Sequence, residues 1–450
     1  DFTQTSAGTL KVDVDATGGA ADLISVDGTA TLAGTVDIDL TTGDPVSETI
    51  ILTAAGGITD DGITIGTVVG AINPLTTVSL AFPSADDLAV SIALNTVLGD
   101  FNANQTAVAK NINDGASPPA LSALLKLSSI SDTQDALSQM TPEAHISAQT
   151  ALIYATEGAL DDLFSCQTAG NGQSVLSEGN CMWLRPQGRQ FESDATSQNA
   201  GYDERVGGLS MGAQWALEND FHAGLSFGFE RANLTTTSDA TSKSDRLHGG
   251  AVLKYHSDAW SVAGGVIGGQ AQVETTRNTI LGANAAAYDM RYLGAQVRAQ
   301  YFVERGGFYA KPSIDVNMTR VTRDQFDETG VRGTALSVDG GAQTYLSVAP
   351  AIELGNEWHM DGGVVLRAYA KAGQTFYNDS SVSLSSGFLN APDGTLNFQT
   401  TNGLDDRFAE FEAGITVFAT QGHTFQVGYQ GRVAENSNQH GAFLKGTFQF

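Results

Sequence analysis

Residues 141–164, TPEAHISAQTALIYATEGALDDLF, carry the pattern of one continuous helix. Thr141 is suited to cap its N-terminus, Pro142 to the first helical position, and Glu143 to the positive end of the helix dipole. The 22 residues from Glu143 to Phe164 would span about 33 Å at 1.5 Å per residue, close to the ~30 Å thickness of a bilayer core.

The polar residues of this stretch argue against a helix that faces lipid, because each of them is costly in hydrocarbon. They are Glu143, His145, Gln149, Glu157, Asp161 and Asp162. A polar helix of bilayer length fits inside a water-filled pore. The sequence therefore predicts a pore helix over residues 141–165, whose charged side chains are Glu143, Glu157, Asp161 and Asp162.

The balance of charge is strongly acidic and uneven. The 450 residues carry 23 basic and 50 acidic side chains, a formal net charge of −27. We expect no nucleic-acid partner, because phosphates would be repelled. Residues 1–180 hold 3 basic and 22 acidic residues, whereas residues 181–450 hold 20 and 28. This difference predicts a domain boundary near residue 180.

No apolar run of 18 residues occurs in the sequence. We therefore expect no transmembrane helix and no retained signal peptide. A chain that starts at Asp1 is expected to be a mature or trimmed form.

Residues 1–100 read as short strands separated by Gly-rich turns. At Val36, Ile38 and Leu40, apolar residues alternate with polar ones, which gives the strand one buried face. The pattern predicts either the rungs of a β-solenoid or a small β-sandwich. The pairs Asp13/Asp15 and Asp37/Asp39 could bind Ca²⁺ or form a solvated face. Because the Gly-Gly-x-Gly-x-Asp repeat of calcium-binding β-rolls is absent, we expect the solvated face and no bound metal. Residues 101–140 have helical spacing and read as a linker of short helices.

From residue 181 to the C-terminus, strands of about ten residues alternate apolar side chains with polar or small ones. We expect twelve strands. They are 181–191, 207–217, 221–232, 245–257, 259–273, 286–304, 307–320, 343–355, 358–374, 406–419, 423–434 and 439–450. The sequence thus predicts an all-β membrane protein, a 12-stranded antiparallel outer-membrane β-barrel over residues 181–450 with an α-helix in its pore.

The connections between these strands alternate in length. Short ones lie around Asn219 and Gln421-Gly422, and long ones near 192–206, 233–244, 274–285, 321–342, 375–405 and 435–438. Outer-membrane barrels have this asymmetry, with tight periplasmic turns and longer outer loops. Proline inside a strand removes a ladder hydrogen bond, so bulges are expected at three positions. These are Pro186, Pro312 and Pro350.

The alternation places an excess of basic side chains on the lumen face. We expect five of them to face the acidic helix. These are Arg185, Arg189, Arg298, Lys311 and Arg367. Cys166 and Cys181, the only cysteines, flank a loop rich in Gly and Ser. In an oxidising periplasm they could pair; otherwise they are two reduced thiols.

Motifs for catalysis are weak. Two matches to G-x-S-x-G, at Ser210 and Ser226, lie inside alternating strands, whereas a nucleophile elbow needs a strand-to-helix turn. The sequence contains no H-E-x-x-H, and residues 1–100 contain no His or Cys and a single Lys. We therefore expect no enzyme, no cofactor and no metal site.

The strings ALSQMTPEAH (136–145) and SAQTAL (147–152) resemble the segment that precedes the translocator barrel of monomeric autotransporters, a family of type V secretion. The twelve strands and the C-terminal GTFQF (446–450) are similar to that barrel. Residues 21–34 are similar to the last solenoid rungs of autotransporter passengers.

The resemblance implies a monomeric protein in the outer membrane of a Gram-negative bacterium. Its barrel would export its own N-terminal passenger to the cell surface, and the helix would then plug the pore. Residues 1–100 would be a passenger remnant. The terminal aromatic residues Phe448 and Phe450 would be read by the outer-membrane barrel-assembly machinery. The implied partners are thus the lipid bilayer, the assembly machinery and the passenger itself.

In one subgroup of the family the helix is cut at an Asn pair. Residues 142–165 contain no Asn, so the resemblance does not imply this cleavage here.

Two other functions are weighed against export of a passenger. A surface adhesin, whose remaining stem binds a target and whose barrel is only an anchor, stays open as an alternative. A porin-like channel is disfavoured, because a porin does not need a polar helix of bilayer length upstream of its barrel.

Overall fold

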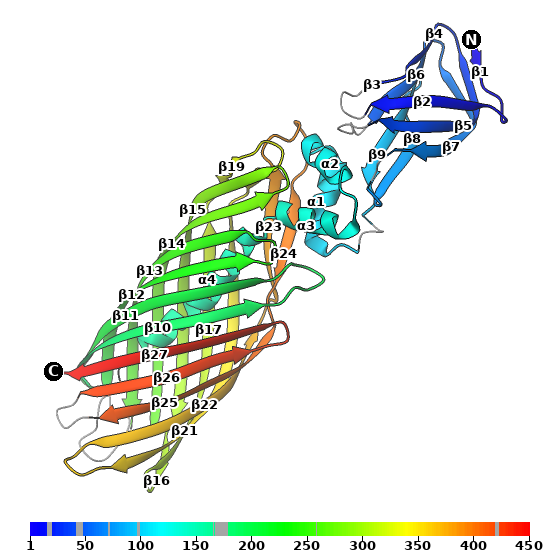
Figure 1. Cartoon of the computed structure of the whole chain (residues 1–450). Helices are drawn as coiled ribbons and strands as arrows, with labels where there is room; N and C mark the ends of the chain where they lie inside the picture. Colours follow the sequence, from blue (N-terminus) through cyan, green and yellow to red (C-terminus); the bar gives the residue numbers. More distant parts are fainter. Residues whose placement is uncertain are drawn as a thin grey trace.

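The structure is a computed structural model that describes residues 1–15, 20–41, 48–70, 73–96, 100–164, 166, 179–257, 259–418 and 423–450. Figure 1 shows three parts in line: an N-terminal β unit, a group of three short helices, and a β-barrel that contains one long helix. The N-terminus and the C-terminus lie at opposite ends of the molecule. The expected connection at Gln421-Gly422 lies outside the described residues.

The N-terminal unit is a short β-solenoid, one of the two folds that the sequence allowed. Its strands β1, β5 and β7 run parallel, and Phe2 lies opposite Ala30, which in turn lies opposite Ile58. Each coil therefore advances by 28 residues. On the second face, Ile24 of β4 lies opposite Leu52 of β6, again in parallel. The hairpin of β8 and β9 closes this face with antiparallel pairing.

The strands of this unit are β1 (Phe2–Thr3), β2 (Thr9–Asp15), β3 (Ala20–Ala21), β4 (Ile24–Val26), β5 (Ala30–Thr41), β6 (Glu48–Ala54), β7 (Ile58–Val69), β8 (Thr76–Ser84) and β9 (Asp87–Leu94). Alternate residues of β5 fill the core between the two faces, as Val36 and Ile38 show by their burial. The expected one-sided apolar pattern is thus present.

Three short helices follow: α1 (Ala103–Asn113), α2 (Pro118–Leu125) and α3 (Ile130–Met140). A reciprocal capping box between Asn102 and Gln105 starts α1. The amide of Asn73 donates to the Leu124 carbonyl at 2.8 Å, which ties the solenoid to α2. The helical group therefore lies between the solenoid and the barrel (Figure 1).

The long helix α4 (Glu143–Leu163) has 21 residues and lies inside the barrel (Figure 1). Its expected cap at Thr141 is wrong. The Thr141 hydroxyl donates to the Ser138 carbonyl at 2.7 Å, so it ends α3, and Pro142 is the N-cap of α4. The hydroxyl of Thr141 therefore satisfies a carbonyl at the end of α3 and caps no N–H group at the start of α4. Among the described residues, no helix is long and apolar enough to cross a bilayer.

Twelve long strands of the described chain form one closed antiparallel barrel. They are β10 (Cys181–Ser193), β11 (Tyr202–Ala216), β12 (Phe221–Thr236), β13 (Thr241–Ser257), β14 (Trp260–Thr279), β15 (Gly282–Tyr301), β17 (Phe308–Arg323), β21 (Gly341–His359), β22 (Val365–Tyr377), β25 (Arg407–Phe418), β26 (Thr424–Val433) and β27 (Ser437–Gln449). The pairing of β10 with β27 closes the ring. The predicted 12-stranded barrel with a helix in its pore is therefore confirmed.

In the barrel, apolar side chains are on the outside and charged side chains are on the inside, which is the reverse of a soluble protein. In β12, Leu225 and Phe227 are 58% and 47% exposed, whereas Glu230 is 3% exposed. Apolar side chains thus point outward and charged ones point into the lumen. This is the alternation of a barrel that crosses lipid.

Three of the expected long loops are wrong. Only residues 280–281 separate β14 from β15, only 237–240 separate β12 from β13, and only 434–436 separate β26 from β27. The strands extend beyond the apolar band, where both of their faces are polar, so the alternation that marks a strand fades while the hydrogen-bonded ladder continues.

The bulges expected at the prolines are also wrong. The pairing of β21 with β22 is interrupted at Pro350, but its register is the same before and after it, with Val348 opposite Phe376 and Ala351 opposite Gly373. Pro312 lies opposite Ile352 within an unshifted register, and the pairing of β10 with β27 resumes unshifted beyond Pro186. Loss of single hydrogen bonds is tolerated because the ladders on either side hold the register.

The two longest loops, 324–340 and 378–406, contain a small antiparallel sheet that the sequence did not predict. Its strands are β18 (Phe326–Asp327), β20 (Leu336–Val338), β23 (Ser381–Phe388) and β24 (Phe398–Gly403). Apolar side chains such as Val382 and Leu384 are buried beneath it. This sheet, together with α1–α3, covers one mouth of the barrel, which we call the cap end (Figure 1). Short strands β16 (Val303–Arg305) and β19 (Thr329–Gly330) extend the barrel sheet.

Candidate functional site

The candidate site is the contact between α4 and the lumen wall. Glycines on neighbouring strands make room for the helix. A Cβ atom added at Gly294 would lie 2.9 Å from the side chains of Leu160 and Thr156, and one at Gly265 would lie 3.0 Å from Leu163. The helix therefore packs directly on the backbone of β14 and β15. Nearly all of its side chains are buried.

At the cap end, a buried charge cluster fixes the start of α4. The Arg277 guanidinium makes two hydrogen bonds to Glu328, of 2.7 and 2.6 Å, and His145 Nε2 lies 2.8 Å from the same carboxylate. Arg277 also donates to the Gln139 carbonyl at 2.7 Å and to the Thr141 carbonyl at 3.2 Å. One arginine thus joins the barrel wall, the loop that carries Glu328, and the turn between α3 and α4.

Glu328 remains ionised in this cluster. Burial raises the pKa of its carboxyl, but the charge of Arg277 and the hydrogen bonds from Arg277 and His145 outweigh burial and hold the pKa well below its usual value. Sequence reasoning missed Arg277 and Glu328. They are separated by 51 residues in the chain, and no local pattern pairs them.

Glu143 lies at the same mouth, and within the described part of the chain its carboxylate has no cationic partner. It accepts hydrogen bonds from the Asn104 amide and from the backbone N–H of Ala200, both at 2.9 Å. It therefore connects α4 to α1 and to the loop between β10 and β11.

In the middle of the lumen, Glu157 faces β21, β22 and β26. It accepts hydrogen bonds from Ser347 at 2.9 Å, from the Tyr377 hydroxyl, and from Arg432 at 3.2 Å. Arg432 also contacts Glu410 at 3.0 Å. The basic partner of Glu157 is thus Arg432, which was not among the five residues expected to face the helix.

At its last turn, α4 meets two of the expected arginines. Arg298 donates to Asp161 at 2.6 Å, and Arg185 forms an ion pair with Asp162. The Lys254 ammonium donates to the Phe164 carbonyl at 3.4 Å, which satisfies part of the helix C-terminus. The two neighbouring carboxylates are therefore held by different strands, β15 and β10.

The other three expected partners form ion pairs with carboxylates of the barrel wall. Lys311 pairs with Glu353 at 2.7 Å and Arg367 pairs with Glu357 at 2.8 Å. Each pair sits at directly opposed positions of neighbouring strands, where opposite charges attract most strongly. Arg189 binds Glu230 with two hydrogen bonds, of 2.6 and 2.8 Å, and it also lies beside the helix, because a Cβ atom placed at Gly158 would be 3.9 Å from its guanidinium.

Beside the C-terminal half of α4 the lumen contains a cavity of about 200 Å³, lined mainly by charged and polar side chains. Arg185, Arg298, Lys311 and Arg367 all border it, as does Asp161. The cavity lies toward the end of the barrel that is opposite to the cap. The helix thus leaves a polar chamber in the lumen beside its C-terminal half.

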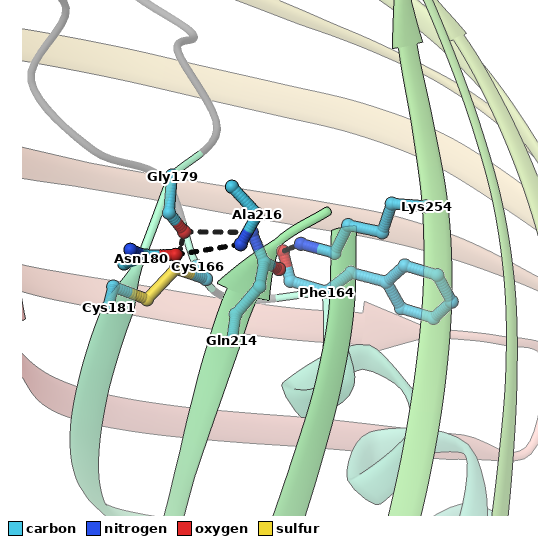
Figure 2. The surroundings of a disulfide bond; sticks show 8 residues. All are labelled: Phe164, Cys166, Gly179, Asn180, Cys181, Gln214, Ala216 and Lys254. Atoms are coloured by element: carbon cyan, nitrogen blue, oxygen red, sulfur yellow. Dashed lines mark hydrogen bonds between the residues drawn. A yellow bond between two sulfur atoms is a disulfide. The ribbon is translucent and has the colours of Figure 1, made fainter. Parts of the chain in front are cut away.

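The ends of the barrel chain meet at the far end of the barrel. Phe448 and Phe450 are 41% and 59% exposed and lie on the outer, lipid-facing side. Met182 of β10 is opposite Phe448 of β27. Nearby, Cys166 and Cys181 are joined by a disulfide (Figure 2).

Ser210 and Ser226 lie within β11 and β12, in the middle of long strands. Within the described ranges, no three His, Cys, Asp or Glu side chains converge as ligands for a metal ion. The chemistry of the lumen is therefore that of ion pairs and hydrogen bonds.

Comparison with known proteins agrees with this geometry. The sequence model of the family described as "Autotransporter beta-domain" matches residues 182–430, more than half of the chain. The translocator domain of autotransporter NalP from Neisseria meningitidis has a TM-score of 0.50 and 14% identity, over 68% of this chain and 97% of that one. The transport unit of the autotransporter AIDA-I from Escherichia coli has a TM-score of 0.49 and 15% identity, over 66% and 98%.

A curated relative, the extracellular serine protease of Serratia marcescens, is 21% identical over 292 residues, which are 63% of this chain and 27% of the relative. The chain thus spans about a quarter of the length of that relative. The resemblance noted in the sequence is confirmed by the family match and by the shared barrel fold. The chain belongs to the autotransporter β-domain family and is an outer-membrane translocator barrel.

Proposed function

We propose that this protein is the translocator unit of an autotransporter, which exports its own N-terminal passenger to the cell surface and is then closed by α4. In this proposal, residues 1–100 are a passenger remnant, 101–140 a helical linker, 141–165 the pore helix, and 181–450 the translocator barrel. The chain acts in transport and is not an enzyme.

The observation that carries the proposal is the pairing of the helix with the wall. The helix has four carboxylates and no Lys or Arg. Three of them meet a basic side chain of the lumen: Asp161 meets Arg298, Asp162 meets Arg185, and Glu157 meets Arg432. A helix that carries this much charge is unsuited to lipid, and three of its four carboxylates have a cationic partner inside the pore.

The orientation follows from where the passenger remnant lies. The solenoid and α1–α3 are at the cap end, and Phe450 is at the opposite end (Figure 1). An exported passenger must be outside the cell, so the cap end faces the exterior and the end with Phe450 faces the periplasm. The exposed rings of Phe448 and Phe450 are then available to the barrel-assembly machinery as the last strand closes on β10.

Single-channel conductance in planar lipid bilayers tests the proposal. We expect the intact protein to be nearly closed and a protein that lacks residues 1–164 to form a stable open channel. The double variant Glu157→Lys, Asp161→Lys should open more often than the intact protein, because both charges would then repel Arg432 and Arg298. Charge reversal of Asp245, whose ion pair with Arg231 is on the outer surface, is the matched control and should leave the pore closed. Equal conductance of the intact and truncated proteins would contradict the proposal.

A further inference from the structure

The disulfide joins the chain just beyond α4 to the first residue of the barrel. Cys166 comes three residues after the helix ends at Leu163, and Cys181 begins β10. Both cysteines are buried, at 1% and 0% exposure, and Trp183 packs against them. The bond therefore lies inside the barrel wall, at the end opposite to the cap.

The strand side of this bond is itself held in place, as Figure 2 shows. The Asn180 side chain accepts a hydrogen bond from the backbone N–H of Ala216 at 2.7 Å, and the Gln214 amide donates to the Gly179 carbonyl at 3.3 Å. Both contacts attach the residues before Cys181 to β11. A pull on the helix would thus be transmitted through the sulfur atoms to two barrel strands.

Without the bond, the connection between helix and barrel would be long. Cys166 and Cys181 are 15 residues apart, and an extended chain of that length reaches about 50 Å. The 21 residues of α4 measure about 32 Å. An open connection would therefore let the helix withdraw by its whole length. The disulfide instead holds the two Cα atoms 6.4 Å apart.

We propose that the Cys166–Cys181 disulfide is a tether that sets the depth of α4 in the lumen and prevents its withdrawal through the cap end. This inference rests on the proposed function, in which α4 closes the pore. The ion pairs of Asp161 and Asp162 select the position of the helix, and the covalent bond makes that position permanent while the exported part of the chain pulls on it from outside.

Formation of the tether requires an oxidant of the dithiol–disulfide class on the periplasmic side. The two S–H bonds break, the bond between the sulfur atoms forms, and two electrons and two protons pass to the disulfide of the oxidant, which becomes a dithiol. Reduction by a dithiol reverses each change. Because the bond is buried against Trp183, a reductant reaches it slowly in the folded protein, and cysteine variants are the cleaner perturbation.

The test uses the direction of an applied voltage. The helix carries four carboxylates and no Lys or Arg, so a potential that is positive on the cap side pulls it out of the pore and the opposite potential does not. The oxidised intact protein should stay closed at both polarities. The double variant Cys166→Ser, Cys181→Ser should show about a tenfold or greater rise in open probability when the cap side is positive, since each charge responds to the field.

Single variants control for the loss of one cysteine alone. Cys166→Ser and Cys181→Ser each keep one thiol and form no bond between these two positions. Both should behave as the double serine variant does. Gel mobility with and without heating checks that every variant contains a folded barrel.

The outcomes distinguish this inference from the proposed function. If the intact protein is closed and the double serine variant also stays closed at both polarities, the tether is refuted. If either single serine variant stays as closed as the intact protein at both polarities, the tether is refuted as well. If the intact oxidised protein conducts like one that lacks residues 1–164, the closing role of α4 fails instead.

Discussion

Replacement of Arg185 by Met tests how much one lumen ion pair contributes to the closed pore. Asp162 is almost fully buried, and its other carboxylate oxygen has no hydrogen-bond partner within the described structure. The change therefore leaves a buried charge without its cation. Truncating one partner of such a pair costs about 3–5 kcal/mol.

The lower end of this range applies here. The cavity of about 200 Å³ borders Arg185, so water can reach the stranded carboxylate and reduce the cost to ~3 kcal/mol. In the withdrawn helix Asp162 is hydrated, so the cost falls on the closed state alone. At 1.4 kcal/mol for each factor of ten, the ratio of open to closed pores should rise roughly a hundredfold.

The measurement is open probability in planar bilayers, made in the Cys166→Ser, Cys181→Ser background so that only non-covalent contacts hold the helix. The second variant, Arg185→Met with Asp162→Asn, removes the unpaired charge and should recover at least half of the lost free energy. Arg231→Met, which breaks an exposed pair on the outer surface, should change the ratio by less than about threefold. An unchanged ratio for Arg185→Met, or a double variant more open than the single one, would refute the reasoning.

Three further predictions concern topology, assembly and the cap end. Cysteines introduced at the exposed positions Asp327 and Asn390 should react with a membrane-impermeant maleimide on intact cells, whereas one at Asn219, in a turn at the opposite end, should not; labelling at Asn219 alone would reverse the proposed orientation. Deletion of Phe450 should lower the yield of heat-modifiable, folded barrel in outer membranes, because the closing strand loses a lipid-facing aromatic ring, and an unchanged yield would argue against its role. Glu328→Ala should cost about 3 kcal/mol, because Arg277 is left buried without its anion, and should speed amide hydrogen exchange in the first turns of α4, with exposed Asp327→Ala as the control. The pKa of Glu328 is lowered in the folded protein, so its contribution to stability is complete above the usual carboxylate pKa and is lost only as the pH falls toward the lower folded value. Amide exchange in α4 that accelerates already between pH 7 and 5 would contradict the role given to the ionised Glu328.

Much of the site could be predicted from sequence because its periodicities are local. The polar helix from Glu143 and the alternation of strands such as Phe221–Thr236 are visible within short windows. Arg185 and Arg298 were expected to face the helix because alternation decides which side of a strand points into the lumen. The helix cap at Thr141 was predicted wrongly, because its hydroxyl serves the preceding helix.

Long-range choices could not be predicted in the same way. The sequence places Lys311 and Arg367 in the lumen, but strand register sets Glu353 and Glu357 directly opposite them. The polar extensions of β14 and β15 carry too little apolar alternation to be told from loops. The sheet at the cap end combines two loops separated by the strands β21 and β22.

By itself, the sequence determined the number of barrel strands, which faces meet lipid, and the presence of a polar helix as long as a bilayer is thick. These properties follow from side-chain period and chain length, which each segment carries on its own. Only the tertiary structure decided that Glu157 meets Arg432, that Arg277 joins Glu328 to the start of the helix, and that Cys166 bonds to Cys181. In a closed barrel, the register of every strand fixes which lumen side chains share a depth, and that register exists only once the ring has closed.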